Sequence, residues 1–178
     1  HYECRPFTEE LAIIQYDETM HTFTSPMHVS PRRTATEEIY HSLHYGLQSF
    51  MDSLGLKKVV IGVSGGIDSA VNAALYATVL PPENILLVNM PSCYNSETTK
   101  GLANDLADTL GCLYTVIPVQ DSLELTRSQF SSAMLYQKDK PMGHLQLTSF
   151  IEENIQARDR SSRILAAAAA AFGGVFTC

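Results

Sequence analysis

The stretch VVIGVSGGIDS, residues 59–69, decides the fold because it joins a buried strand to a helix through a glycine-rich turn. Residues 59–63 are mostly β-branched and lie between Lys57-Lys58 and the glycines, which predicts a buried strand of the parallel type. Helix-forming residues follow from Asp68 to Leu80, and Pro81-Pro82 ends that run. The stretch therefore predicts a strand, a tight turn and a helix in immediate succession.

The same alternation continues along the chain. An apolar run over 85–90 predicts a second buried strand, residues 96–110 predict a helix that ends at Gly111, and residues 113–117 predict a third strand. Strands that alternate with helices are typical of a parallel sheet covered by helices. We expect an α/β fold with a doubly wound parallel sheet, helices on both faces, and a ligand at the carboxyl ends of the strands.

Other elements are predicted on either side of this unit. Thr34 and Glu37 have the spacing of a capping box, which predicts a helix over 34–54. A short helix is predicted over 121–130, an exposed loop over 136–144 with a lid as one interpretation, and a long helix over 148–172 followed by a strand from 175. Residues 11–16 predict a short strand near the start.

The turn between the first strand and its helix carries the chemistry. A helix that begins at the carboxyl end of a parallel strand offers unpaired amide groups and the positive end of its dipole, and glycines let the backbone close around an anion. The hydroxyls of Ser64 and Ser69 can donate to phosphate, and Asp68 can hold Mg²⁺ that bridges phosphates. The predicted nucleotide-binding residues are Gly62, Val63, Ser64, Gly65, Gly66, Ile67, Asp68 and Ser69.

The turn also has other interpretations. The glycines can simply turn the chain while Asp68 caps the helix. The turn is neither a GxxxxGK[ST] loop nor a GxGxxG fingerprint. No general base is compelled by the sequence, so no catalytic residue is assigned.

Three motifs in order resemble one family. SGGIDS over 64–69 resembles the pyrophosphate-binding loop of the N-type ATP pyrophosphatases, and MPSCYNS over 90–96 and ENIQAR over 153–158 resemble segments of the glutamine-dependent NAD synthetases. The resemblance covers about residues 34–178 and implies the fold of the adenine nucleotide alpha hydrolases. It also implies that ATP and Mg²⁺ are used to amidate deamido-NAD⁺ to NAD⁺ through an acyl-adenylate, with ammonia derived from glutamine and release of AMP and pyrophosphate.

The resemblance further implies that Asn154 and Arg158 bind deamido-NAD⁺. The helical register bears on Arg158 independently. At about 100° per residue, Ile151, Ile155 and Arg158 fall on one side together with Ser162 and Leu165, while Arg160 points the opposite way. A buried guanidinium requires an anion or several acceptors. The alternatives for Arg158 are that it reaches solvent or pairs with Asp105 or Asp108.

Rival functions stay open at this point. Another N-type ATP pyrophosphatase such as a GMP synthetase shares the loop, and a nucleotide-binding module without turnover also fits it. A comparison of deamido-NAD⁺ with xanthosine monophosphate as substrate distinguishes an NAD synthetase from a GMP synthetase. Release of pyrophosphate from ATP distinguishes an enzyme from a binding module.

Composition and the ends of the chain set further expectations. The chain has 178 residues with 12 Lys+Arg against 19 Asp+Glu, and this acidic balance argues against nucleic acid as the main partner. No apolar stretch is long enough to span a membrane, and the four cysteines form no CxxC pair, so a reduced, cytoplasmic protein is expected. We expect residues 1–33 to be a linker and the tail of an upstream domain such as a nitrilase-like amidase. Residues 34–178 would be a synthetase domain that lacks its C-terminal part, and the resemblance implies a homo-oligomer.

Overall fold

The computed structural model describes residues 4–24, 33–92 and 97–178. They divide into two compact units, His1–Phe50 and Met51–Cys178. In the first unit, β1 (Gln15–Asp17) pairs antiparallel with β2 (Thr22–Thr24). The helix α1 (Ala35–Ser53) begins in this unit and crosses into the second. The predicted domain boundary at residue 33 remains a prediction.

A parallel sheet forms the centre of the second unit. It contains β3 (Val59–Val63), β4 (Ile85–Asn89), β5 (Leu113–Val116) and β8 (Val175–Thr177), in the order β5-β4-β3-β8. All five residues of β3 are buried, as expected for a β-branched strand with a neighbour on each side.

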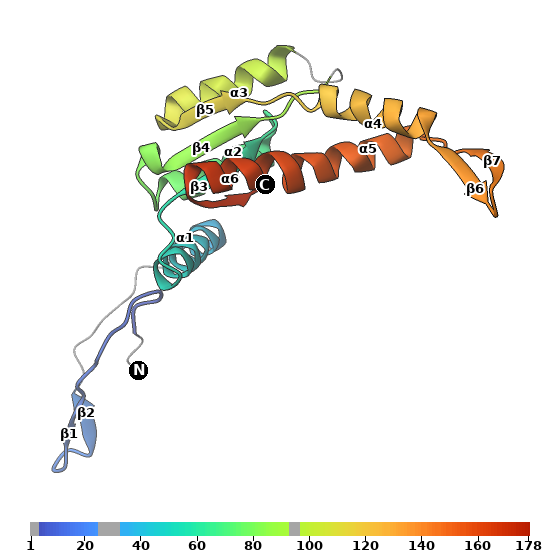
Figure 1. Ribbon diagram of the computed structural model, residues 1–178. Coiled ribbons are helices and arrows are strands. Elements are labelled where there is room, and N and C mark those ends of the chain that lie inside the picture. The colour runs from blue at the N-terminus through green and yellow to red at the C-terminus, as the bar shows by residue number, and fades with distance from the viewer. Residues whose placement is uncertain (1–3, 25–32, 93–96) are drawn as a thin grey trace. The chain divides into compact units, whose positions relative to one another are not determined.

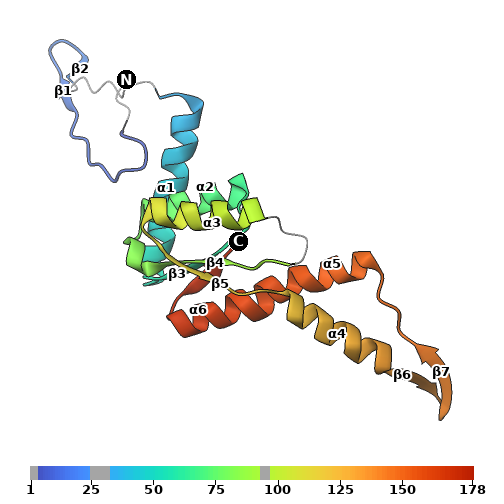
Figure 2. The same ribbon diagram turned by 90° about the horizontal axis from the view of Figure 1, so that it is seen from above.

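Helices cover both faces of this sheet (Figures 1 and 2). Side chains alternate along β3, so that Ile61 packs in one apolar cluster with Ala73 of α2 (Ile67–Ala77) and Ala103 of α3 (Glu97–Leu110). Val60 packs in a second cluster, with Leu165 and with Ala169 of α6 (Ala166–Phe172). Each fully buried aliphatic side chain of this kind contributes about 1.5–3 kcal/mol.

The order of the strands confirms the doubly wound fold. The chain runs outward from β3 to β4 and β5, then returns to place β8 on the other side of β3. The strand order therefore reverses at β3, between β4 on one side and β8 on the other, and ligands bind at the carboxyl edge of the sheet at such a position.

The predicted loop over 136–144 is wrong. A short 3-10 helix, η1 (Pro82–Asn84), precedes β4, and the helix α4 (Gln120–Ser132) follows β5. After α4, the strands β6 (Met134–Gln137) and β7 (Lys140–His144) form an antiparallel hairpin. Lys138 and Asp139 form its turn with φ of 48° and 64°. Turns of this geometry usually contain Asn-Gly, and Pro141 and Gly143 are tolerated because the strands are exposed. The interpretation as a lid stays a prediction.

The long helix predicted over 148–172 changes from α-helical to π-helical geometry and back along its length. It consists of α5 (Ser149–Arg158), the π-helical segment η2 (Asp159–Leu165) and α6, joined without a break in right-handed helical backbone. A π-helix bonds residue i to i+5 and has more residues per turn than an α-helix. A register computed at about 100° per residue therefore fails beyond Arg158.

Two further expectations concern the N-terminal region. The capping box is confirmed, because the amide of Thr34 donates to Glu37 Oε2 at 2.7 Å and the amide of Glu37 donates to Thr34 Oγ1 at 3.3 Å. The strand predicted over 11–16 is wrong in its bounds, because β1 begins only at Gln15. Leu11 and Ile13 are exposed and have no strand structure.

Residues 93–96, which include Cys93 and the predicted start of α3, lie outside the described residues.

No helix in the part of the chain that the structure describes combines the length and apolar character needed to cross a bilayer.

Candidate functional site

The loop after β3 is held by its own serines. Ser69 Oγ donates to the carbonyl of Gly66 at 3.0 Å and accepts from the amide of Ser64 at 3.3 Å. Ser64 Oγ accepts from the amide of Gly66 at 3.2 Å and lies 3.4 Å from Ser69 Oγ. These contacts fold residues 64–69 into a tight turn before any ligand is present.

Two glycines permit this turn. Gly65 has a φ of 83°, in the left-handed region that strains a residue with a side chain. A Cβ on Gly66 would lie 3.2 Å from Ser64 Oγ, so a side chain there would press on the hydroxyl that holds the loop.

The N-terminus of α2 is open toward solvent. Its N-cap residue, Gly66, makes no side-chain capping bond, and the first bond into the helix runs from the amide of Ala70 to the carbonyl of Gly66 at 3.2 Å. The amides of Ile67, Asp68 and Ser69 therefore have no partner within the helix. Together with the helix dipole they favour an anion at this position.

A cavity of about 610 Å³ opens beside this loop at the carboxyl edge of the sheet. This volume lies in the range of small-molecule sites. Its walls come from β3 and the loop, α2, the end of β4, α5 with η2, and the residue after β8. The lining residues are Gly62, Val63, Ser64, Asp68, Ser69, Asn72, Asn89, Met90, Ala157, Arg160, Ser161, Leu165 and Cys178.

Five of the eight predicted nucleotide-binding residues line this cavity: Gly62, Val63, Ser64, Asp68 and Ser69. Gly65, Gly66 and Ile67 belong to the same loop and helix start but are not among the lining residues. The structure thus brings the predicted loop to one side of a cavity, and its ligand remains a matter of proposal.

Asp68 is the carboxylate of this cavity. It is exposed in the first turn of α2. Among the described residues, no group of three or more His, Cys, Asp or Glu side chains could hold a metal ion by itself. A single carboxylate still fits Mg²⁺, which keeps several waters and binds through one or two carboxylates together with phosphate oxygens.

Arg160 lines the cavity, although the helical register places it opposite the side that was expected to face inward. Its Nε donates to the carbonyl of Met90 at 3.3 Å, and the residue is half-buried. Arg160 does point away from Arg158, as expected, but the expected inward side of the helix is wrong. A π-helix turns less per residue than an α-helix, so across η2 the buried Leu165 rotates away from the side of Arg158 and onto the side of Arg160. The sequence offered no signal for the π-helix.

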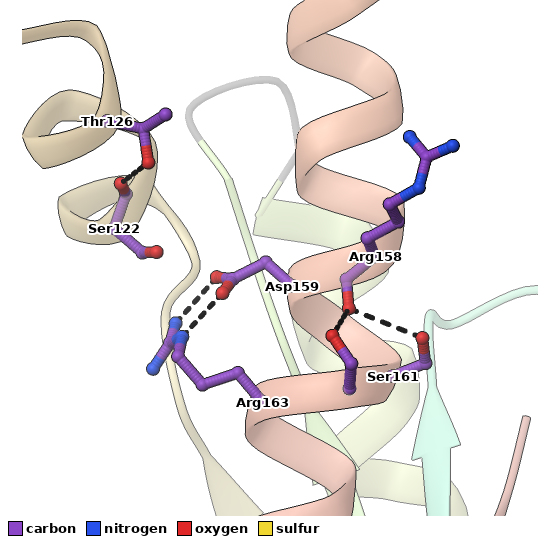
Figure 3. A network of polar contacts seen from close by, with 7 residues as sticks. Ser122, Thr126, Arg158, Asp159, Ser161 and Arg163 are labelled. Atoms are coloured by element: carbon purple, nitrogen blue, oxygen red, sulfur yellow. Dashed lines mark hydrogen bonds and ion pairs between the residues drawn. The ribbon is translucent and has the colours of Figure 1, made fainter. Parts of the chain in front are cut away.

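A polar network holds η2 on the side away from Arg158 (Figure 3). Arg163 donates to Asp159 through Nε and through Nη2, the latter at 2.6 Å. These hydrogen bonds, with a smaller contribution from Ser122 of α4, hold the pKa of Asp159 below its usual value. On the same side, Arg127 of α4 donates two hydrogen bonds of 2.6 Å to Glu152 of α5.

Asn154 and Arg158 are not placed on the cavity. The side-chain Nδ2 of Asn154 donates to the backbone carbonyl of Phe150 in its own helix at 2.9 Å. Arg158 is exposed, and Figure 3 shows its guanidinium pointing away from Asp159 and Arg163. Its backbone carbonyl accepts from the hydroxyls of Ser161 and Ser162. This exposure agrees with the alternative in which Arg158 reaches solvent, and its predicted role in binding deamido-NAD⁺ stays untested.

Sequence reasoning missed four polar residues of the cavity: Asn72, Asn89, Arg160 and Ser161. Asn72 follows Ser69 by three residues, so the spacing on α2 could have placed it on the same face. Asn89 lies inside the buried strand predicted over 85–90, where a polar side chain needs explanation.

The family model described as NAD synthase matches residues 39–175. The chain belongs to the NAD synthase family. The resemblance read from the three motifs is confirmed at the level of the family.

Known members show how the chain relates to this family. A glutamine-dependent NAD(+) synthetase of Synechocystis is 33% identical over 164 residues, which cover 91% of this chain and 27% of that protein. The chain thus spans about a quarter of the length of this relative. The NMN synthetase of Francisella tularensis superposes with a TM-score of 0.66 at 26% identity, covering 81% of this chain and 54% of that chain.

One structure shares the fold over nearly the whole chain. The glutamine-dependent NAD⁺ synthetase of Acinetobacter baumannii, solved in complex with ADP, superposes with a TM-score of 0.78 at 24% identity over 96% of this chain and 30% of that chain. At this identity the likeness concerns the fold.

Proposed function

We propose that this chain binds ATP for the amidation of deamido-NAD⁺ to NAD⁺. The observation that carries the proposal is the cavity of about 610 Å³ whose wall includes the serine-held loop at the open N-terminus of α2. Membership in the NAD synthase family supports the reaction, and the ADP complex of the Acinetobacter baumannii protein supports an adenine nucleotide as the ligand.

The proposed reaction has two steps. The carboxylate of deamido-NAD⁺ attacks the α-phosphate of ATP, and the bond between the α-phosphorus and the oxygen that bridges to the β-phosphate breaks. Pyrophosphate departs, and the product is an acyl-adenylate. Ammonia derived from glutamine then attacks the acyl carbon, the bond to AMP breaks, and the amide of NAD⁺ forms as a proton is lost from nitrogen.

The residues of this chain act by stabilising charge in the first step. The amides of Ile67, Asp68 and Ser69 would donate to the departing pyrophosphate, and Arg160 would oppose its charge from the η2 side. Asp68 would hold Mg²⁺, which neutralises phosphate charge when it is bound. The serine contacts already fix the loop, so little reorganisation is needed when the ligand binds.

Binding is the primary test, since the chain spans about a quarter of its Synechocystis relative. Titration calorimetry with ATP and with pyrophosphate, each with and without Mg²⁺, should give saturable binding. Asp68→Asn should remove most of the Mg²⁺ dependence with little change in unfolding free energy, because Asp68 is exposed. Asp121→Asn is the matched control: Asp121 is a first-turn aspartate of α4 that does not line the cavity. Equal Mg²⁺ dependence in the wild type and in Asp68→Asn would remove Asp68 from the metal site.

Turnover separates the candidate reactions. Pyrophosphate release from ATP is measured with ammonia and deamido-NAD⁺, and in parallel with xanthosine monophosphate. A third arm with nicotinate mononucleotide is warranted because the NMN synthetase of Francisella tularensis shares the fold at 26% identity. Binding of ATP without pyrophosphate release in any arm would favour a binding module. A homo-oligomer and a cytoplasmic location remain predictions.

A further inference from the structure

Asp159 is a carboxylate that the fold largely covers. Its side chain is 12% exposed, whereas that of Arg163 is 51% exposed. Both carboxylate oxygens accept hydrogen bonds from Arg163, Oδ1 from Nε and Oδ2 from Nη2. Figure 3 shows the two side chains together on the side of η2 that faces α4. The covered negative charge therefore has a matched partner, which a charge removed from water requires.

Arg160, the next residue along the chain, has its side chain on the cavity. Its Nε donates to the carbonyl of Met90 at 3.3 Å, while neither Asp159 nor Arg163 is among the lining residues of this cavity. The pKa of Asp159 is lowered first by hydrogen bonds from Arg163, and the charge of Arg160 adds a smaller contribution. Arg160 and Asp159 thus attract each other, although one belongs to the cavity side of η2 and the other to the α4 side.

Loss of Arg163 would leave a covered carboxylate directly beside Arg160 in the sequence. A carboxylate without its partner attracts the nearest cation, and it also opposes the binding of an anion close by. It would therefore compete with an anion in the cavity for the guanidinium of Arg160. Because Arg163 engages both oxygens of Asp159, this competition is suppressed in the native chain.

We infer that Arg163 is a positioning residue, which keeps the guanidinium of Arg160 available for the diphosphate group at the loop over 64–69 by engaging Asp159; this rests on the proposed function. Arg163 does not touch the ligand in this arrangement and acts through Arg160. The ligand group concerned is a polyphosphate, since a guanidinium forms charge-assisted hydrogen bonds with phosphate oxygens.

The test measures Kd by titration calorimetry for pyrophosphate and for adenosine, which has no phosphate. Arg163→Gln should raise the Kd of pyrophosphate about fivefold, because the carboxylate of Asp159 is then uncompensated. Adenosine should bind Arg163→Gln and the wild type within about twofold of each other, since it carries no charge for Arg160 to meet. An equal loss for both ligands would overturn the inference.

Removal of Asp159 together with Arg163 separates positioning from a merely structural role. The double variant Asp159→Asn/Arg163→Gln has no carboxylate left to compete, so its Kd for pyrophosphate should return to within about twofold of the wild type. An ion pair that only stiffened η2 would not be replaced by this double change. A double variant that binds as weakly as Arg163→Gln, or more weakly, would overturn the inference.

A second double variant tests whether Arg163 acts through Arg160. In the Arg160→Gln background, the further change Arg163→Gln should alter the Kd of pyrophosphate by less than about twofold, because the guanidinium that it protects is already absent. An undiminished fivefold loss in this background would mean that Arg163 attracts the anion by itself, and the inference would be wrong.

Arg127→Gln is the matched control. Arg127 donates two hydrogen bonds to Glu152, as Arg163 does to Asp159, but neither Arg127 nor Glu152 is among the lining residues of the described cavity. This variant makes the same change in net charge and should leave the Kd of pyrophosphate within about twofold of the wild type. A loss equal to that of Arg163→Gln would overturn the inference.

The melting temperature shows whether each variant is folded. If Arg163→Gln folds poorly, Arg163→Met gives the same comparison, because methionine retains an apolar stem like that of arginine. Wild-type affinity in a folded Arg163 variant would overturn this inference and leave the proposed function standing. Wild-type protein that binds neither ATP nor pyrophosphate would overturn the proposed function, and this inference with it.

Discussion

Arg160 carries a positive charge on the cavity wall two residues away from the exposed Arg158. Replacing Arg160 with Gln should weaken pyrophosphate binding about tenfold, because a charge-assisted hydrogen bond is removed from a partly desolvated site. Arg158→Gln is the matched control and should leave the Kd of pyrophosphate within about twofold. Titration calorimetry measures both, and equal losses in the two variants would contradict the placement of Arg160.

The same two residues show what could be predicted about the site. The loop over 64–69 could be predicted because its glycines, its serines and the flanking strand all indicate one structure. The side of the helix that lines the cavity could not, because the π-helical winding of η2 brings the buried Leu165 onto the side of Arg160, and no local motif signals this winding. Asn89 was missed because its neighbours read as an ordinary buried strand.

At the scale of elements, the Asp159–Arg163 pair stabilises η2 in a pH-dependent way. Hydrogen bonds from Arg163 hold the pKa of Asp159 below the ordinary value of 3.8. The unfolded chain therefore binds the proton more tightly, so the stabilisation is present above pH about 4 and is lost as pH falls through the lowered pKa.

Asp159→Asn should accordingly lower the unfolding free energy at pH 7 by about 0.5–1 kcal/mol, the upper part of the range for surface pairs, because Arg163 is half exposed while Asp159 is mostly covered. The difference from the wild type should be smaller at pH about 2 than at pH 7, because the stabilisation is lost as pH falls from the unfolded value through the lowered pKa of Asp159. Urea denaturation at the two pH values measures this. Asp105→Asn, at an exposed position on α3, is the control. A difference that stays constant with pH would contradict the assignment.

The connection between α6 and β8 depends on Gly174. A Cβ on Gly174 would lie 2.4 Å from the carbonyl oxygen of Lys58, which accepts the first hydrogen bond of β8 from the amide of Val175. Gly174→Ala should therefore lower the unfolding free energy by about 1–3 kcal/mol. Gly101→Ala, in the interior of α3 with no atom within 4 Å of the added Cβ, should raise it by about 0.5–1 kcal/mol. Thermal denaturation of both variants is the measurement, and a stable Gly174→Ala protein would contradict the close approach.

At the scale of the whole chain, the hairpin β6–β7 lies beyond the ends of α4 and α5, away from the sheet (Figure 1). None of its residues belongs to the two described core clusters or lines the described cavity. Replacing residues 134–144 with a short Gly-Ser linker should leave the Kd of ATP within about twofold. A large loss of affinity would instead support the interpretation of this segment as a lid.

The fold as a whole was predictable for a physical reason. Strands β3 and β4 are buried almost throughout and therefore read as continuous apolar runs, and each helix between β3, β4 and β5 is followed by a glycine or proline. The hairpin was not predictable in this way, because both its strands are exposed and its turn uses Lys138 and Asp139.

The pairing of Val59 with Val175 joins the two most distant parts of the sheet in sequence. Such long-range contacts form late when a chain folds, because closing a long loop costs entropy before the contact repays it. A growing polypeptide would thus expose the loop over 64–69 well before η2 and β8 complete the cavity beside it. ATP should then slow the unfolding rate without accelerating refolding, and stopped-flow traces with and without nucleotide would reveal that asymmetry.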